Sequence, residues 1–200
     1  MYNRDQPEIE RHMFESPKGF VDSLEFVLTT IQAGLSTCRN QRRQIARDGL
    51  QAACLWGKKA DGLRYGREHA ARLLPEFERL RSRQATEEAV TLATSIPCLG
   101  LPKAGFLCQL MGFDVACFDS HNLAREGLPT SFVRLNKQAK PATQLKHIER
   151  YVQHCQKAGS AYWWDSWCEH VAGNRANRRL TTPDAVSRYH VAAVKMEAGQ

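Results

Sequence analysis

Apolar residues recur every three to four positions along most of this chain, a spacing that places them on one face of an α-helix. The first such segment begins at Ser16 and Pro17, a capping hydroxyl followed by a proline suited to the first helical position, and we expect it to end at Gly34. A second helix is expected over residues 37–56. No pair of alternating apolar and polar segments flanks an Asn-Gly or Asp-Gly turn, so the pattern predicts an all-helical fold.

Prolines divide the middle of the chain. Residues 58–83 are predicted to form one or two helices broken near Pro75, and residues 87–95 to form a short helix. Residues 102–111 should form the next helix, because its first residue is a proline whose missing N–H would have had no partner there. A further short helix is expected after Asp119.

In the last part of the chain, the residue pattern predicts a basic loop over residues 129–142 and a helix over residues 143–157. The inward positions expected on that helix are Leu145, Ile148, Val152 and Cys155. Two more helices are expected to begin near Tyr162 and at Thr182-Pro183.

Composition narrows the class of protein. The 200 residues, of which 42% are hydrophobic, suffice for one compact helical domain over residues 1–200. Lys and Arg number 28 against 21 Asp and Glu, and the resulting formal charge of +7 favours a polyanionic partner. No apolar run approaches the length of a membrane span, and the N-terminus lacks the apolar core of a secretory signal, so we expect a cytoplasmic protein with no membrane partner.

The seven cysteines are scattered, odd in number and never arranged as Cys-x-x-Cys. This distribution argues against a disulfide framework and against a structural zinc or iron–sulfur site. We therefore expect small buried thiols, no metal and no cofactor.

The most specific pattern is residues 96–108, Ile-Pro-Cys-Leu-Gly-Leu-Pro-Lys-Ala-Gly-Phe-Leu-Cys, followed by Phe-Asp-Ser-His-Asn from Phe118. It predicts a tight hairpin that opens a helix, with the carboxylate of Asp119 placed soon after that helix ends. Backbone N–H groups without partners at a helix N-terminus, together with the positive end of the helix dipole, can bind phosphate.

Residues 87–125 resemble the helix-hairpin-helix and aspartate signature of the DNA glycosylase superfamily typified by endonuclease III. Ile96-Pro97 matches the opening of that signature, Leu99-Gly100 its hairpin, Ala104 its alanine and Phe118–His121 its acidic motif. The resemblance covers about a fifth of the chain. It implies a two-lobed all-α fold, with a helix-hairpin-helix and aspartate segment at 87–126, that grips double-stranded DNA and acts on a flipped-out base.

On this resemblance Asp119 is the expected catalytic residue. It would stabilise positive charge on the deoxyribose as the base leaves, and would orient or deprotonate the attacking water. The residues expected to contact DNA are Leu99, Gly100, Leu101, Lys103, His121 and Asn122. The alternative is that Asp119 only caps the helix that follows it, since Asp is a favoured capping residue.

Two positions depart from the family pattern. Cys98 stands where the first hairpin glycine is usual. Pro102 stands where strand-cleaving members carry their Schiff-base lysine, and Lys103 comes one position later, which turns a helical side chain by about 100 degrees. This shift favours Lys103 as a phosphate contact over a nucleophile.

The main expectation is a monofunctional N-glycosylase that removes a damaged or modified base and leaves an abasic site. The first alternative is a phage-type transferase that places an amino acid or polyamine on an activated 5-hydroxymethyl pyrimidine, with Asp119 deprotonating the amine. The second is a DNA-binding protein without catalysis, against which the retained Asp119 counts. Either enzyme would act in a bacterial or phage-infected cell.

Overall fold

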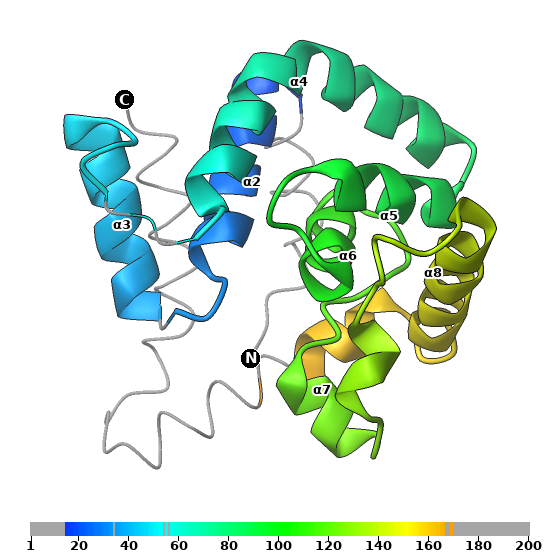
Figure 1. The fold of residues 1–200 in the computed structure, drawn as a ribbon. Helices are drawn as coiled ribbons and strands as arrows, with labels where there is room; N and C mark the ends of the chain where they lie inside the picture. Colours follow the sequence, from blue (N-terminus) through cyan, green and yellow to red (C-terminus); the bar gives the residue numbers. More distant parts are fainter. Residues whose placement is uncertain (1–14, 34, 54, 56, 167–168, 170–200) are drawn as a thin grey trace.

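The computed structural model describes residues 15–33, 35–53, 55, 57–166 and 169 (Figure 1). All regular secondary structure within these ranges is helical, and they contain no strand. The predicted all-α class is therefore confirmed for the described part of the chain. The helix predicted from Thr182-Pro183 lies outside the described residues.

The first described helix, α2 (Pro17–Thr29), begins as predicted. The Ser16 hydroxyl caps it by accepting the Gly19 N–H at 3.1 Å. The helix ends at Thr29, earlier than predicted, and Gly34 lies outside the described residues. The hydroxyls of Thr29 and Thr30 donate to backbone carbonyls of the last turn, which helps to close the helix there. Its buried apolar residues are Phe20, Leu24, Val27 and Leu28.

The next helix, α3 (Leu35–Asp48), is shorter than the predicted 37–56. Gly49 has a φ of +85°, a left-handed conformation that glycine adopts without strain and that ends a helix. Residues 50–53, which the prediction placed in the helix, form a turn, and Ala53 in this turn is buried. The prediction therefore extended the helix beyond its observed end at Asp48.

The long helix α4 (Lys59–Ser82) runs through Pro75 without the predicted break. Figure 1 shows that it changes direction partway along its length. An internal proline removes one backbone hydrogen bond and lowers the stability of a helix by roughly 3 kcal/mol. Each large apolar side chain that stays buried stabilises the fold by roughly 2 kcal/mol. The buried apolar side chains on both sides of the proline are Leu73, Leu74, Phe77 and Leu80.

The remaining helices are α5 (Thr86–Ser95), α6 (Leu101–Leu110), α7 (Ser120–Arg125), the 3-10 turn η1 (Thr130–Val133) and α8 (Pro141–Gln156). Residues 160–166 are also helical. Three predicted short helices are confirmed, with starts that agree to within two residues: those at 87–95, at 102–111 and after Asp119. The predicted loop at 129–142 contains one helical turn, η1.

One inward position predicted on α8 is wrong. Leu145 is 42% exposed, although Ile148, Val152 and Cys155 are buried as expected. No residue from 141 to 147 is buried, so the first two turns of α8 extend beyond the core and leave Leu145 in solvent. Tyr151 fills the inward position that the prediction overlooked.

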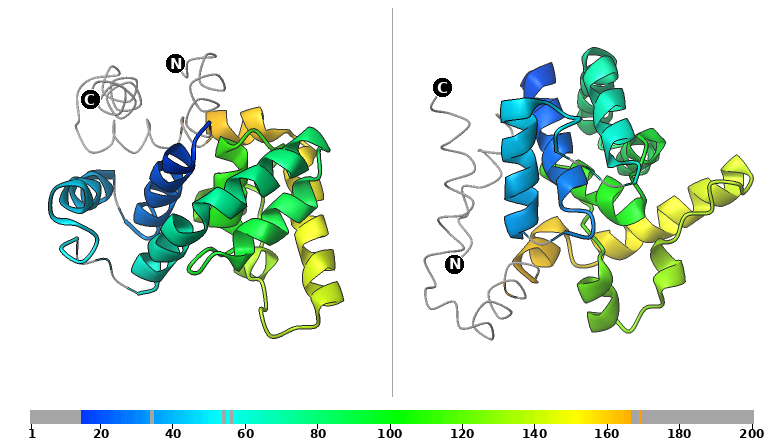
Figure 2. Two further views of the ribbon diagram at one scale, coloured as in Figure 1. Left: turned by 90° about the horizontal axis from the view of Figure 1, so that it is seen from above. Right: turned by 60° about the vertical axis from the view of Figure 1, so that its left-hand side comes forward.

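The helices pack into one continuous apolar cluster. α2 contacts α3, α4 and α6, while α5 contacts α4, α6 and α8. All three ribbon views place α3 and α8 at opposite ends of the molecule (Figures 1 and 2). Within the described residues, no helix combines the length and apolar character that a membrane span requires.

Candidate functional site

The turn between α5 and α6, residues 96–100, buries Ile96 and Leu99, leaves Pro97 and Cys98 half-buried and exposes Gly100. The Leu99 N–H donates to the Ile96 carbonyl at 3.2 Å, which closes the turn. Cys98 takes a φ of +73° at the position where the resembled family carries a glycine. Gly62 of α4 lies against the Pro97 carbonyl so closely that no Cβ would fit between them. The turn is therefore held from beneath by a close backbone contact.

The N-terminus of α6 follows directly. Gly100 is the N-cap, and its carbonyl accepts the N–H groups of Lys103 at 3.1 Å and Ala104 at 2.8 Å. The helix begins at Leu101, so Pro102 occupies the second helical position and not the predicted first. Gly100 is exposed, and a Cβ built there would have its nearest neighbour 4.0 Å away.

The structure separates the residues that were predicted to contact DNA. Gly100 is exposed, and Lys103 and His121 are half-buried. Leu99 and Leu101 are buried in the apolar core, because the turn packs its leucines inward. Their side chains therefore do not form a DNA-facing surface, which corrects that part of the prediction.

Asn122 also requires correction. It is 1% exposed, and its side-chain N–H donates to the Cys117 carbonyl at 2.9 Å. This contact ties the first turn of α7 to the segment that precedes it. Asn122 thus supports the position of Asp119 from inside the protein instead of contacting DNA from its surface.

Asp119 is the N-cap of α7, as the capping alternative predicted. Its Oδ1 accepts the backbone N–H groups of His121 at 3.0 Å and Asn122 at 3.2 Å. Among the described residues, none donates a hydrogen bond to Oδ2. Asp119 is half-buried, so the carboxylate is fixed through one oxygen and is not closed off from the surface.

Lys103 and Asp119 are both within electrostatic range of Cys117. Both charges act on the Cys117 thiol, the lysine lowering its pKa and the carboxylate raising it, but burial dominates and raises that pKa to about 11. The thiol is therefore protonated near neutral pH and is not a nucleophile. The Lys103 ammonium donates to the Thr30 hydroxyl at 3.2 Å and lies 5.3 Å from the centre of the Phe106 ring.

Sequence reasoning missed Lys59, which lies beneath the turn. It is 1% exposed, and burial lowers the pKa of its ammonium. The Cys98 and Cys38 thiols and the Lys103 ammonium are close enough to act on it. Nothing in the pattern around Lys58 and Lys59 distinguishes this lysine from an exposed one.

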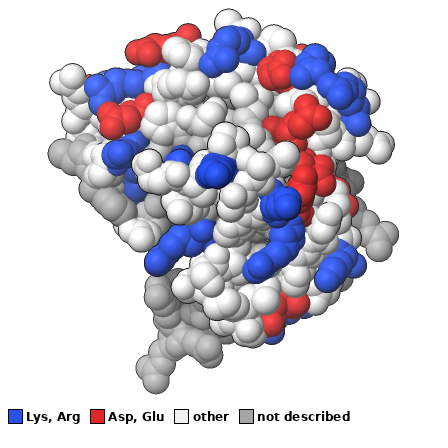
Figure 3. Space-filling model, turned by 45° about the vertical axis from the view of Figure 1, so that its right-hand side comes forward, with Lys and Arg blue, Asp and Glu red and all other residues white. Residues whose placement is uncertain are grey.

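Charge and metal-binding capacity further limit the chemistry. On the face drawn in Figure 3, Lys and Arg side chains form several small groups, some of them beside Asp and Glu side chains, and uncharged residues separate the groups. Phosphate binding on that face would depend on individual residues and not on one continuous basic patch. Across the described ranges, no group of three or more His, Cys, Asp and Glu side chains could hold a metal ion.

Comparison with known proteins identifies no relative: no family model, no curated protein and no solved structure matches this chain.

Proposed function

We propose that the protein is a DNA-binding enzyme of helix-hairpin-helix type, with a two-lobed glycosylase-like fold, that removes a base by hydrolysis of its N-glycosidic bond. One observation carries the proposal. The Asp119 carboxylate and the Lys103 ammonium are both close enough to Cys117 to act on the pKa of its thiol, and Lys103 stands in the first turn of α6, directly after the 96–100 turn. A carboxylate fixed through one oxygen, with a cation and an exposed helix N-cap in the same region, suits a site where a phosphate is held and positive charge develops nearby.

Asp119 would perform the chemistry. Its Oδ1 is held by two backbone N–H groups, so the carboxylate needs little reorganisation when a substrate arrives. As the bond between the sugar carbon and the base nitrogen breaks, Oδ2 would stabilise the positive charge on the sugar. The carboxylate would then take a proton from the water that adds to the sugar carbon, and that proton would pass to the departing base, so that the products are the neutral base, the abasic sugar and the regenerated carboxylate.

The absence of a suitable lysine nucleophile limits the reaction to base removal. Pro102 stands at the position of the Schiff-base lysine in the resembled family. Lys103 donates from its ammonium to the hydroxyl of Thr30, the C-cap of α2, and would there be available to a phosphate at the edge of the turn. The product would be an abasic site with both strands intact.

Asp119→Asn tests the chemistry separately from the fold. Asparagine is as good an N-cap as aspartate, so α7 should keep its cap while the charge is lost. Duplexes with single damaged or modified bases would be incubated with each protein and the released bases followed by mass spectrometry. We expect base release by the wild type and a loss of about 100-fold or more in the variant.

Asp114→Asn is the matched control. Asp114 is also an aspartate whose Oδ1 accepts a backbone N–H, that of Ser160 at 2.8 Å, yet it lies outside the proposed site. Its variant should release bases at the wild-type rate. Equal losses in both variants, or no release by any protein, would contradict the proposal. A gain of mass that needs Asp119 and an added amine, with the glycosidic bond intact, would contradict base excision and indicate the transferase.

DNA binding is tested at the exposed N-cap. Gly100→Glu places a carboxylate where a phosphate should lie, whereas Gly100→Ala fits the open space and changes no charge. We expect Gly100→Glu and Lys103→Glu each to weaken binding about tenfold or more at low salt for every duplex sequence, and to lower the salt dependence. Lys146→Glu makes the same charge change as Lys103→Glu at an exposed position on α8 and should have little effect. Equal affinities for all four variants would remove the turn from the DNA interface.

A further inference from the structure

In the described part of the chain, α3 is the helix with the largest excess of basic over acidic residues. It carries four arginines and one carboxylate, that of Asp48 at its C-terminal end. Its apolar residues Cys38 and Ile45 are buried, and α3 packs against α2 (Figure 1). The apolar side therefore holds α3 to the protein, and the arginines determine what its other sides can bind.

The side of α3 opposite Cys38 and Ile45 carries five exposed polar residues. They are Ser36, Asn40, Arg43, Gln44 and Arg47, called here the α3 face. Their spacing of four, three, one and three positions places them along one side of a helix. Each of these side chains can donate a hydrogen bond, and none is negatively charged. The α3 face is therefore suited to an anionic partner.

The chemistry of the α3 face favours nucleic acid over a lipid surface. A helix that lies in a membrane interface needs large apolar side chains beside its cations, and the α3 face has none. Guanidinium groups bind phosphates, and the amides of Asn40 and Gln44 can donate to phosphates or to base edges. With 14 residues, α3 is about 20 Å long, so several successive phosphates of a duplex would lie within its reach.

The arginines of α3 have different partners. The Nε of Arg42 donates to the buried Glu25 of α2 at 3.4 Å, which fixes α3 on α2. Arg43 forms no ion pair with any described residue. Arg47 pairs with Asp48, but both side chains are exposed, and an exposed pair contributes little stability. Arg43 and Arg47 are thus the arginines that a phosphate can reach.

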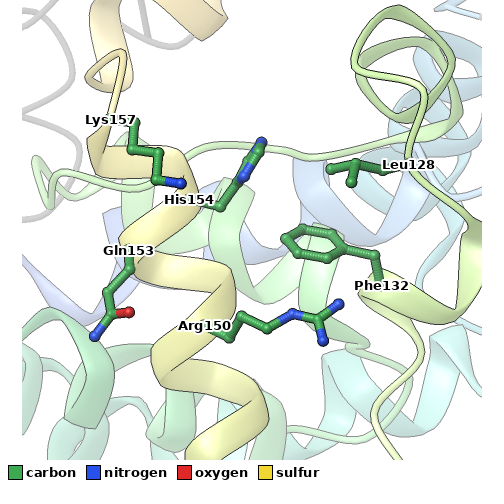
Figure 4. Close-up of a pocket in the computed structure, with 6 residues that line it drawn as sticks. All are labelled: Leu128, Phe132, Arg150, Gln153, His154 and Lys157. Atoms are coloured by element: carbon green, nitrogen blue, oxygen red, sulfur yellow. The ribbon is translucent and has the colours of Figure 1, made fainter.

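A basic residue of α8 provides a comparison. A hollow of about 350 Å³ lies between α8 and the loop that follows α7 (Figure 4). Its floor is the Phe132 ring, which is 3% exposed, and the Arg150 guanidinium lies 4.9 Å from the centre of that ring. Arg150 therefore covers part of its own protein and leaves no open ring there for a ligand. It is an exposed arginine whose loss should not affect a ligand at α3.

The last turn of α2 supports both α3 and the start of α6. The Cys38 thiol of α3 and the Thr29 hydroxyl are hydrogen-bonded at 3.0 Å. The next residue, Thr30, accepts the Lys103 ammonium of α6 at 3.2 Å. Because adjacent residues of α2 hold the two elements, α3 flanks the region of the 96–100 turn, and one duplex would reach both.

We propose that the α3 face is a second DNA-binding surface, in which Arg43 and Arg47 bind phosphates of the duplex that the 96–100 turn holds. Asn40 and Gln44 would donate hydrogen bonds beside these phosphates. The inference rests on the proposed DNA binding but uses none of the residues assigned to base removal. α3 would position the duplex and would take no part in the reaction.

The test is fluorescence anisotropy of the full chain with a labelled duplex of about 20 base pairs, two helical turns, over a range of salt concentrations. We expect Arg43→Gln and Arg47→Gln each to weaken binding about three- to tenfold at low salt. Each should also lower the slope of log affinity against log salt concentration by about one, because one phosphate contact is lost. Arg150→Gln makes the same change on α8, at the opposite end of the molecule, and should alter neither quantity. All three residues are exposed, so the variants should fold, and circular dichroism checks this.

Asp48→Asn tests the same surface by a gain of affinity. It removes the carboxylate that pairs with Arg47, so the guanidinium becomes fully available to a phosphate. We expect binding about threefold tighter at low salt, and a smaller gain when Arg47→Gln is added. Unchanged affinity in Asp48→Asn would contradict the exchange of Asp48 for a phosphate.

The outcomes separate this inference from the proposed function. A wild type that binds no duplex would overturn both. Duplex binding that Gly100→Glu weakens, but that Arg43→Gln and Arg47→Gln leave unchanged, would overturn the α3 inference alone. Duplex binding weakened by both arginine variants, without release of any base, would support the α3 inference and contradict base excision. Arginine-dependent binding to phosphatidylserine vesicles in place of the duplex would overturn the inference in favour of a lipid surface.

Discussion

The 96–100 turn and the hollow beside α8 are built in two different ways. The turn is built from close backbone contacts, with its leucines buried and Gly100 exposed. The hollow presents long charged side chains over a buried ring. A region made of backbone contacts depends on the packing beneath it, so it is sensitive to single added atoms. A region made of surface side chains can lose them without unfolding.

Tyr151, a buried residue of α8, packs beside Phe132 of η1 and bonds to the segment that leads to Asp119. Its hydroxyl donates to the Ala116 carbonyl at 2.6 Å and accepts the Phe118 N–H at 3.3 Å. A Cβ on Gly105 of α6 would lie 2.6 Å from the same hydroxyl. Because this contact fixes the segment that leads to Asp119, changes here test whether the two regions depend on each other.

The largest effect is expected for Gly105→Ala. The added methyl group would overlap the Ala116 carbonyl and the Tyr151 hydroxyl, neither of which is the free end of a flexible chain. We expect the free energy of unfolding to fall by about 3 kcal/mol, measured by urea denaturation. Gly100→Ala adds the same methyl group in open space and should cost about 1 kcal/mol or less. Equal losses of unfolding free energy in the two variants would show that close packing around Gly105 does not determine the stability.

Tyr151→Phe should have the next largest effect. It removes the hydroxyl but keeps the ring that packs beside Phe118 and Phe132. The buried Phe118 N–H would lose its acceptor, so we expect a loss of about 2 kcal/mol in the free energy of unfolding. Base release should fall as well, because the segment carrying Asp119 loses its anchor. A change below about 0.5 kcal/mol would mean that water replaces the hydroxyl.

The sequence predicted much of the fold because its signals were local. Ser16 and Pro17 indicated a helix start, and Asp119 indicated both a cap and a candidate acid. The errors arose where tertiary packing outweighed the local signal. Pro75 did not break α4 because apolar residues on both sides stay buried, and Leu145 was exposed because the first two turns of α8 contain no buried residue.

The candidate site was only partly predictable. The order of turn, helix and aspartate could be identified from the sequence of residues 96–119. Which of their side chains are buried could not. Leu99, Leu101 and Asn122 face the interior because of how α5, α6 and α7 pack, and Lys59 reaches the site from a distant part of the chain. The hollow combines residues 128–132 with 150–157, whose contact depends on how α8 folds back, and no short motif records that contact.

A smaller effect, dependent on pH, is expected at the hollow. Burial holds the pKa of His154 below its ordinary value of 6.5, so the unfolded chain takes up the proton first as the pH falls. The stability that the neutral imidazole contributes is complete above pH 6.5 and is lost as the pH falls from there toward the folded pKa. His154→Gln should therefore reduce the slope of the free energy of unfolding against pH in this range. Identical slopes for the two proteins would contradict the inference that His154 is buried in its neutral form.

The smallest effect should come from the second link between the two regions. Lys137, in the loop before α8, donates from its ammonium to the Thr94 carbonyl in the last turn of α5 at 2.8 Å. The bond is partly exposed, so Lys137→Met should lower the free energy of unfolding by only about 0.5 kcal/mol. Local stability should respond more than global stability, because the loop loses its tie to α5 while the core is unchanged. Faster amide exchange in residues 134–140, with exchange in α6 unaltered, would show that this loop opens by itself. Faster exchange in α6 as well would mean that the turn and the hollow are coupled through Lys137 as well as through Tyr151.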